Sequence, residues 1–251
     1  METRLYKMTW PEVKEYLKEN DVVIFPVGSQ EQHGKHLAED NDSFTATVIA
    51  KMVGEKTGVL VAPTLPFGNS VHHMNFPGSV TLTFSTLVNI YKEVCKSLLH
   101  HGFKKVVIMN AHGGNTNAIS EALRQIKQET GVTVYSLMAF PSARGFGAES
   151  TKVIKQESGG HACELETSVE LYLGQRVLMD KAEDWKPPKG RTAFDEKWAR
   201  KVSWTRDFDW STEIGSLGVP TAATEEKGKA MVEAVVNEIS EFIEDLKAKK
   251  D

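Results

Sequence analysis

Apolar and polar residues alternate in blocks along the first two-thirds of the chain, and these blocks predict alternating strands and helices. Short apolar runs bounded by polar residues or glycine are typical of buried strands, whereas apolar residues spaced three and four apart are typical of helices that face a core. The predicted strands are 22–27, 59–63, 106–109 and 132–140, and residues 79–83 should also be extended. The predicted helices are 10–19, 42–55, 84–101, a helix burying Ile119 to Ile126, 163–173 and 224–247.

Strands that alternate with helices predict an α/β fold, with a largely parallel sheet covered by helices on both faces. The length of 251 residues and the 40% share of hydrophobic residues favour one domain over 1–251 with a sizeable core. Asn41 or Asp42 is the expected N-cap of the second helix, because their short polar side chains suit that position.

Two stretches, 141–160 and 180–219, lack helix or strand periodicity and predict long loops. The second holds four of the five tryptophans, and loops of this length in a compact domain are usually functional. The tryptophans could pack against a neighbouring subunit or cap an edge of the core, and the sequence favours neither.

Charge and cysteine content narrow the class of protein. A net charge of −4 with scattered Lys and Arg argues against nucleic-acid binding, which requires a basic patch. No apolar run approaches the roughly 18 residues of a membrane span, and the N-terminal residues do not form a signal peptide. Cys95 and Cys163 are too few for a disulfide framework. We therefore expect a cytoplasmic protein with a small-molecule substrate and no nucleic-acid or membrane partner.

The segment GSQEQHGKHL (28–37), followed by Asp42, concentrates metal-binding side chains directly after the first predicted strand. In open α/β sheets, ligands bind in the crevice outside the carboxyl ends of the strands. Glu31 and His33 are separated by one residue, so in extended backbone both point to the same side. The segment alone could also be a solvated polar loop.

His112 follows the apolar strand 106–109, at the position that Glu31 and His33 occupy after the first strand. Gly113 and Gly114 come next and allow a ligand to approach the backbone closely, which makes them candidates for substrate binding. The segment lacks the lysine and the spacing of a phosphate loop, although an anion could still bind at the helix N-terminus. A lone histidine is often structural, but this position favours a functional role.

A third cluster, HACELETS (161–168), places His161, Glu164 and Glu166 at the start of a predicted helix. The glutamates could serve as metal ligands, as a general acid or base, or only as negative charges that favour the helix dipole. The last explanation does not account for the histidine. Spacing alone does not choose between Glu164 and Glu166.

Together these clusters supply carboxylate and imidazole ligands from four elements: Glu31, His33, Asp42, His112, and either Glu164 or Glu166. Such a set suits zinc, manganese or iron, and five side chains exceed what one tetrahedral ion needs. We therefore predict two divalent metal ions with a bridging carboxylate, the arrangement used in metal-assisted hydrolysis.

Five motifs occur in an order that resembles the creatininase (creatinine amidohydrolase) family and span nearly the whole chain. They are GSQEQHGKHL (28–37) with Asp42, HMNFPG (73–78), NAHGGN (110–115), HACELETS (161–168) and GVPT (218–221). The resemblance implies a three-layer α/β/α sandwich, a dinuclear metal centre that is most often zinc, and a homohexamer. It also implies hydrolysis of a cyclic amide or formamide C–N bond by a metal-bound hydroxide.

The resemblance also implies a role for each matching residue. Glu31 and His112 would hold one metal, His33 the other, and Asp42 would bridge them. Creatininase itself has a glutamate where this chain has Gly114, so the missing ligand should come from Glu166, with Glu164 as the alternative.

Three residues take further roles from the resemblance. His161 matches a histidine that passes a proton to the departing nitrogen, and Glu164 is a second catalytic candidate beside it. His73 is where a substrate would be recognised. Residues 137–160 contain none of the gating tryptophans of the creatinine enzyme, which weakens creatinine itself as the substrate.

Three alternatives to a creatinine hydrolase are open. The Gly113–Gly114 form of the motif is similar to branches that deformylate a formylamino-pyrimidine nucleotide or trim a peptide-derived cofactor precursor. A non-catalytic scaffold with a closed structural metal is a second alternative. A dinuclear phosphoesterase ranks low, because only Lys35 and Arg144 lie near the motifs.

Overall fold

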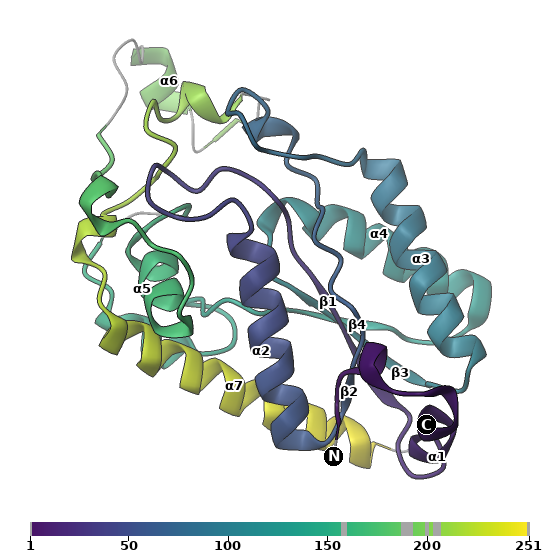
Figure 1. The fold of residues 1–251 in the computed structure, drawn as a ribbon. Helices are drawn as coiled ribbons and strands as arrows, with labels where there is room; N and C mark the ends of the chain where they lie inside the picture. Colours follow the sequence, from purple (N-terminus) through teal and green to yellow (C-terminus); the bar gives the residue numbers. More distant parts are fainter. Residues whose placement is uncertain (1, 157–159, 187–192, 199–200, 203–206, 250–251) are drawn as a thin grey trace.

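A four-stranded, fully parallel sheet forms the centre of the protein in the computed structural model, which describes residues 2–156, 160–186, 193–198, 201–202 and 207–249. The strands are β1 (Val22–Val27), β2 (Leu60–Val61), β3 (Lys105–Asn110) and β4 (Tyr135–Met138). Their order is β2-β1-β3-β4, so β1 and β3 lie at the centre (Figure 1). The predicted parallel α/β sheet is confirmed.

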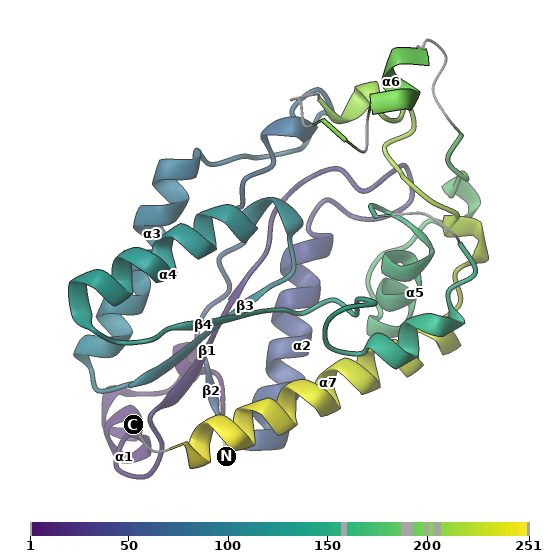
Figure 2. The same ribbon diagram turned by 180° about the vertical axis from the view of Figure 1, so that it is seen from behind.

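Helices cover both faces of the sheet, which gives three layers (Figures 1 and 2). The side chains of β1 alternate between the two faces, as the pleat of a strand requires. Val22 and Ile24 pack with α2 (Asn41–Thr57) and α7 (Glu225–Ala248), beside α5 (Glu164–Leu173). Val23 and Phe25 pack on the opposite face with α1 (Trp10–Tyr16), α3 (Phe84–His100) and α4 (Thr116–Thr130).

The start of α2 corrects a prediction. The N-cap is Asp40, and no side chain caps it, so Asn41 and Asp42 lie inside the first helical turn and are buried. Because Asp42 is helical, its carboxylate is free to point towards the ends of β1 and β3. The helix ends at Gly58, whose φ of 70° is the left-handed conformation that glycine adopts without strain.

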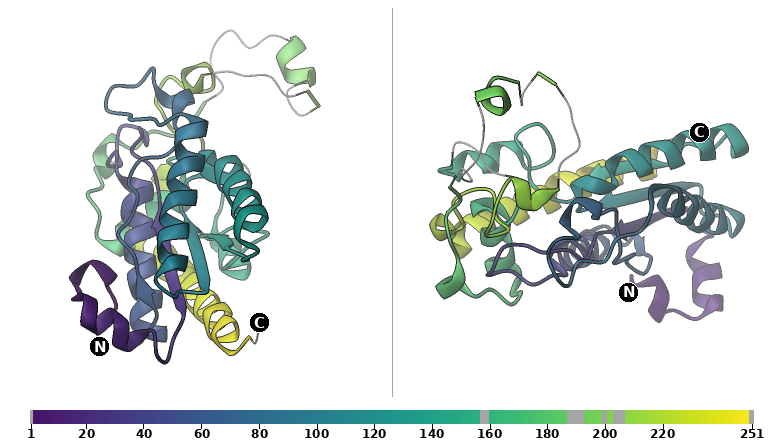
Figure 3. Two further views of the ribbon diagram at one scale, coloured as in Figure 1. Left: turned by 90° about the vertical axis from the view of Figure 1, so that its right-hand side faces the viewer. Right: turned by 90° about the horizontal axis from the view of Figure 1, so that it is seen from above.

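Two other predictions change in detail. Residues 79–83 form no strand; Val80 and Thr81 make only isolated bridges, with Gln30 and Gly68. The stretches 141–160 and 180–219 also contain short helices. These are η4 (Ala148–Val153), η5 (Met179–Lys181), α6 (Ala193–Trp198) and η6 (Phe208–Trp210), with α6 lying away from the sheet (Figure 3).

Several remaining features bear on the sequence predictions. Trp204, one of the four clustered tryptophans, lies outside the described residues. Cys95 and Cys163 are both buried and unpaired. Across the described part of the chain, no helix combines the length and apolar character needed to cross a membrane.

Candidate metal centre

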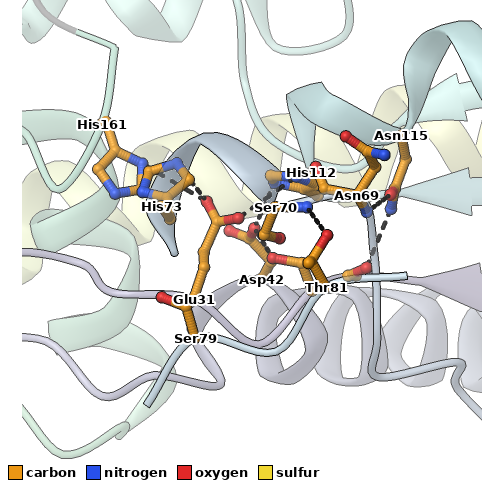
Figure 4. A network of polar contacts seen from close by, with 12 residues as sticks. Glu31, Asp42, Asn69, Ser70, His73, Ser79, Thr81, His112, Asn115 and His161 are labelled. Atoms are coloured by element: carbon orange, nitrogen blue, oxygen red, sulfur yellow. Dashed lines mark hydrogen bonds and ion pairs between the residues drawn. The ribbon is translucent and has the colours of Figure 1, made fainter. Parts of the chain in front are cut away.

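The carboxyl ends of β1 and β3 open onto a buried group of carboxylates and imidazoles (Figure 4). Glu31 and His33 follow β1, and His112 follows β3. Gly28 lets the first turn of α2 approach the end of β1, since a Cβ at this position would lie 2.4 Å from the Ser43 nitrogen. This close approach brings Asp42 into the same group.

Glu31 lies at the middle of the group, between two sets of imidazoles (Figure 4). Its Oε2 is 3.3 Å from His112 Nε2, and its Oε1 is 3.4 Å from His73 Nε2 and 3.8 Å from His161 Nδ1. The residue is 1% exposed. Glu31 therefore links residues that are far apart in the sequence.

Asp42 spans two histidines with its two oxygens. Oδ1 lies 3.2 Å from His33 Nε2, and Oδ2 lies 2.9 Å from His112 Nδ1. The hydroxyl of Ser29 donates to Oδ2 at 3.0 Å and fixes the orientation of the carboxylate. The position of Asp42 between His33 and His112 is the one a bridging ligand requires.

Glu166 joins His33 and His161 in a second set of possible ligand atoms, all within 4.8 Å of one another. Its Oε2 accepts the backbone N–H of Ala162. Ala162 has a φ of 45°, a left-handed conformation that costs a non-glycine residue about 1–2 kcal/mol. Strained backbone of this kind is concentrated at functional sites, and here it directs an amide towards Glu166.

Glu164 lies outside the group, and its carboxylate makes its contacts elsewhere. Its Oε1 forms an ion pair of 2.5 Å with Lys227, and its Oε2 accepts the backbone N–H groups of Lys155 and Gln156 at 2.9 Å. Glu164 begins α5, whereas Glu166 lies two residues further along the helix, so the two side chains point in different directions. Glu164 ties the segment before α5 to α7.

Gly114 packs directly against the His112 ring. A Cβ at this position would lie 2.4 Å from His112 Nε2 and 2.3 Å from the Asn69 carbonyl oxygen. A side chain here would therefore displace the imidazole, so this backbone does not admit a ligand at position 114. Gly113, by contrast, has no atom within 4 Å of its would-be Cβ and borders open space.

Three of the imidazoles share one arrangement: each donates one ring N–H to a backbone carbonyl. His33 Nδ1 donates to Glu31 O at 3.0 Å, His112 Nε2 to Asn69 O at 3.0 Å, and His161 Nε2 to Gln32 O at 2.6 Å. The other ring nitrogen of each histidine faces the carboxylates. Metal-binding histidines characteristically have this partner, because it fixes the tautomer and the ring orientation.

Sequence reasoning missed two polar residues that organise the centre. The Gln32 amide donates to His73 Nδ1 at 2.9 Å, and its oxygen accepts the Gly34 N–H at 2.9 Å. Asn115 donates to Gly28 O at 2.9 Å and accepts the Asn69 N–H at 3.0 Å, which joins the ends of β1 and β3 to the segment before His73. Both residues lie inside the quoted motifs, but amides carry no distinctive ligand signal.

His73, the residue expected to recognise the substrate, is buried and not at the surface. It is 1% exposed and lies in a set of possible ligand atoms with Glu31 and His161. Burial lowers its pKa to about 2, so the ring is neutral.

Burial of the centre disfavours the charged forms of its carboxylates and imidazoles. Burial raises the pKa of Glu31, and raises that of Glu166 to about 7. Burial disfavours protonated His33 and His112, yet the facing carboxylates raise their pKa values to about 10 and 9. Burial likewise disfavours ionised Asp42, but the two imidazoles hold its pKa well below the ordinary value. Positive charge beside these carboxylates therefore stabilises their ionised forms.

Bound metal ions would supply such positive charge. Among the described residues, no Lys or Arg forms an ion pair with Glu31, Asp42 or Glu166. Glu31 Oε2 and His33 Nε2 are buried and have no hydrogen-bond partner. The possible ligand atoms fall into sets that include Glu31–Asp42–His112 and His33–His161–Glu166. Divalent cations would neutralise the carboxylates and engage both unpartnered atoms.

Fold and site together define a parallel α/β protein with a buried centre of metal-ligand type at the carboxyl edge of its sheet. A family model described as "Creatininase: Creatinine amidohydrolase" matches residues 6–243. The chain belongs to the creatininase family.

Known relatives in this family are hydrolases. The chain is 26% identical to 3-dehydro-scyllo-inosose hydrolase of Thermotoga maritima, covering 95% of this chain and 82% of that protein. It is 28% identical to creatinine amidohydrolase of Pseudomonas putida, covering 94% of each. It is 31% identical to the mycofactocin precursor peptide peptidase of Mycolicibacterium smegmatis, covering 86% and 81%. The chain is therefore an enzyme of the hydrolase class.

Solved structures of creatininase have the same fold. A structure described as "Creatininase Mn" superposes with a TM-score of 0.84 at 25% identity and covers 99% of this chain and 100% of that chain. A variant of Zn-Zn type superposes with a TM-score of 0.81 at 25% identity, with the same coverage. The predicted three-layer α/β/α sandwich is confirmed.

Proposed function

We propose that this protein is a dinuclear metal-dependent amidohydrolase that cleaves a cyclic amide or formamide C–N bond. The observation that supports this most is that the two oxygens of Asp42 face His33 and His112, which belong to different sets of possible ligand atoms. One carboxylate facing two imidazoles suits two ions better than one.

Glu31, Asp42 and His112 would hold one ion, and His33, Asp42 and Glu166 the other. Zinc is the first choice, with manganese or iron as alternatives, because the ligands mix carboxylate and imidazole. When bound, paired divalent ions lower the pKa of water and polarise a carbonyl oxygen. Glu166 would supply the metal ligand that position 114 lacks. The packing of Gly114 against His112 excludes a side chain at that position.

His161 is the proton carrier of the proposed reaction. Its Nε2–H donates to the Gln32 carbonyl, which leaves Nδ1 facing the site, 3.8 Å from Glu31 Oε1. Burial lowers the pKa of His161 well below the ordinary value, so the ring is neutral before the reaction. Nδ1 takes a proton in the attack step and delivers it to the departing nitrogen.

His73 and Gly113 border the space in which the substrate would lie. His73 stays neutral, and the Gln32 amide holds its ring by donating to Nδ1 at 2.9 Å. Gly113 keeps one side of His112 open. A planar amide can therefore approach the carboxylates between these two residues.

A substrate screen of metal-loaded protein tests the proposal. Candidate substrates are creatinine, small lactams and N-formyl pyrimidines, the last because a formylamino-pyrimidine nucleotide deformylase of Methanosphaera stadtmanae is 29% identical over 163 residues. Asp42→Ala should abolish metal occupancy and turnover together. Asp40→Ala is the matched control, because Asp40 is exposed and precedes the same helix. Full activity of Asp42→Ala or of chelator-treated protein contradicts the proposal.

We also infer a homo-oligomer, a hexamer by family resemblance, located in the cytoplasm. Light scattering of purified protein measures the number of subunits, and a monomer of 27.9 kDa contradicts the inference.

A further inference from the structure

Phe208 lies over the histidines of the metal centre, although it comes from a distant part of the sequence. Its ring stacks on His73 with centroids 4.3 Å apart and planes 30° apart. It meets His161 edge-on at 4.7 Å and 68°, and His72 at 6.1 Å. One aromatic side chain thus contacts three imidazoles, two of which belong to the centre described above.

The turn that carries Phe208, η6, is anchored on both sides. Asn75 Nδ2 donates to Asp209 Oδ2 at 3.0 Å, which joins η6 to the segment just after His73. Trp185 Nε1 donates to Ser211 O at 3.0 Å behind the turn. These contacts hold the Phe208 ring on the histidine side.

Burial shows what the ring covers. His73 and Glu31 are 1% exposed and His161 is 7% exposed, whereas Phe208 itself is half-buried. Phe208 therefore forms part of the boundary between these side chains and solvent. A substrate that reaches Glu31 and His161 from this side must pass or replace the ring contact between Phe208 and His73.

We propose that Phe208 is a specificity-determining residue of the hydrolase site, which stacks on the planar ring of a cyclic amide substrate. The proposal rests on the amidohydrolase function proposed above and adds the shape of the preferred substrate. An aromatic ring next to flat imidazoles favours a flat ligand, because offset and edge-to-face contacts both need a planar partner. An acyclic formamide presents a smaller flat surface and gains less from this contact.

The test compares a planar cyclic amide with an acyclic formamide in metal-loaded protein. Creatinine and hydantoin serve as ring probes, and N-formylglycine serves as the acyclic probe. The variants are Phe208→Leu, Phe208→Tyr and Asn75→Ala, with Phe84→Leu as control because Phe84 is an exposed aromatic at the start of α3. kcat and KM are measured for each probe, and isothermal titration gives the Kd of hydantoin.

Phe208→Leu should raise KM and Kd for the ring probes by about 3- to 10-fold, the range expected for one lost aromatic contact, with kcat nearly unchanged. Its KM for N-formylglycine should change less than about 2-fold. Phe208→Tyr should retain the wild-type values, Asn75→Ala should shift KM in the same direction by less, and Phe84→Leu should change nothing.

Equal effects of Phe208→Leu on ring and acyclic probes, or no effect on either, would overturn the proposal while leaving the amidohydrolase function intact. A wild-type protein that turns over no probe with full metal content would contradict the proposed function instead. In that case the Kd of hydantoin tests the ring contact on its own. A higher Kd in Phe208→Leu alone supports the contact, and a Kd equal to that of wild type refutes it.

Discussion

Glu170 provides a quantitative test of how burial controls charge near the centre. The side chain is fully buried on α5, and the Thr45 hydroxyl donates to its Oε1, while its Oε2 has no hydrogen-bond partner. Burial raises its pKa to about 8 from an ordinary 4.5. Between pH 4.5 and about 8, Glu170 therefore keeps a proton in the folded protein that it releases in the unfolded chain.

The sign of the pH dependence follows from proton binding. Between pH 4.5 and about 8 the native state binds more protons at Glu170 than the unfolded state, so stability falls as pH rises. Each pH unit in this window changes the free energy of unfolding by about 1.36 kcal/mol. Glu170→Gln removes the titration, so its stability relative to wild type should rise by about 2.7 kcal/mol from pH 5 to pH 7.

Urea denaturation of both proteins at pH 5, 6 and 7 measures this difference directly. Titrating groups that do not interact with Glu170 contribute equally to wild type and variant and cancel. Thr45→Val gives a second check, because losing the hydroxyl donor should raise the Glu170 pKa further. A stability difference that stays constant from pH 5 to pH 7 would show that Glu170 is ionised in the folded protein and that burial does not raise its pKa.

Four further substitutions test the geometry of the centre. Gly114→Ala should weaken metal binding by about 10- to 100-fold, measured by competition with a chelator, because its Cβ would displace His112. Glu166→Gln should also lose metal, whereas Glu164→Gln should keep it and lower the free energy of unfolding by about 3 kcal/mol, since it breaks a buried ion pair. Ala162→Gly should raise stability by up to about 1 kcal/mol in urea denaturation, because glycine tolerates its positive φ, and unchanged stability would argue against strain there.

Most of the fold could be predicted from the sequence. Apolar runs located β1 and β3, and the alternation of strands and helices gave the parallel sheet, because burial imposes these periods locally. The first turn of α2 was misplaced, since both Asn41 and Asp42 are good capping residues in isolation. Close packing at Gly28 places Asp42 inside the helix, and that is a tertiary effect.

The candidate site was only partly predictable. Glu31, His33 and His112 follow strands whose ends must meet, so their proximity follows from topology. The difference between Glu164 and Glu166 depends on Lys227, which comes from a helix more than sixty residues away in the sequence. Phe208 carries no motif signal, because an aromatic residue in a polar loop has many possible partners.

Metal analysis of the purified protein, combined with anomalous diffraction, tests whether the centre holds two ions. We expect two divalent ions per chain, one beside Glu31 and His112 and the other beside His33 and Glu166, with Asp42 between them. A single ion with a closed tetrahedral shell, or a metal-free centre in an active protein, would contradict this expectation.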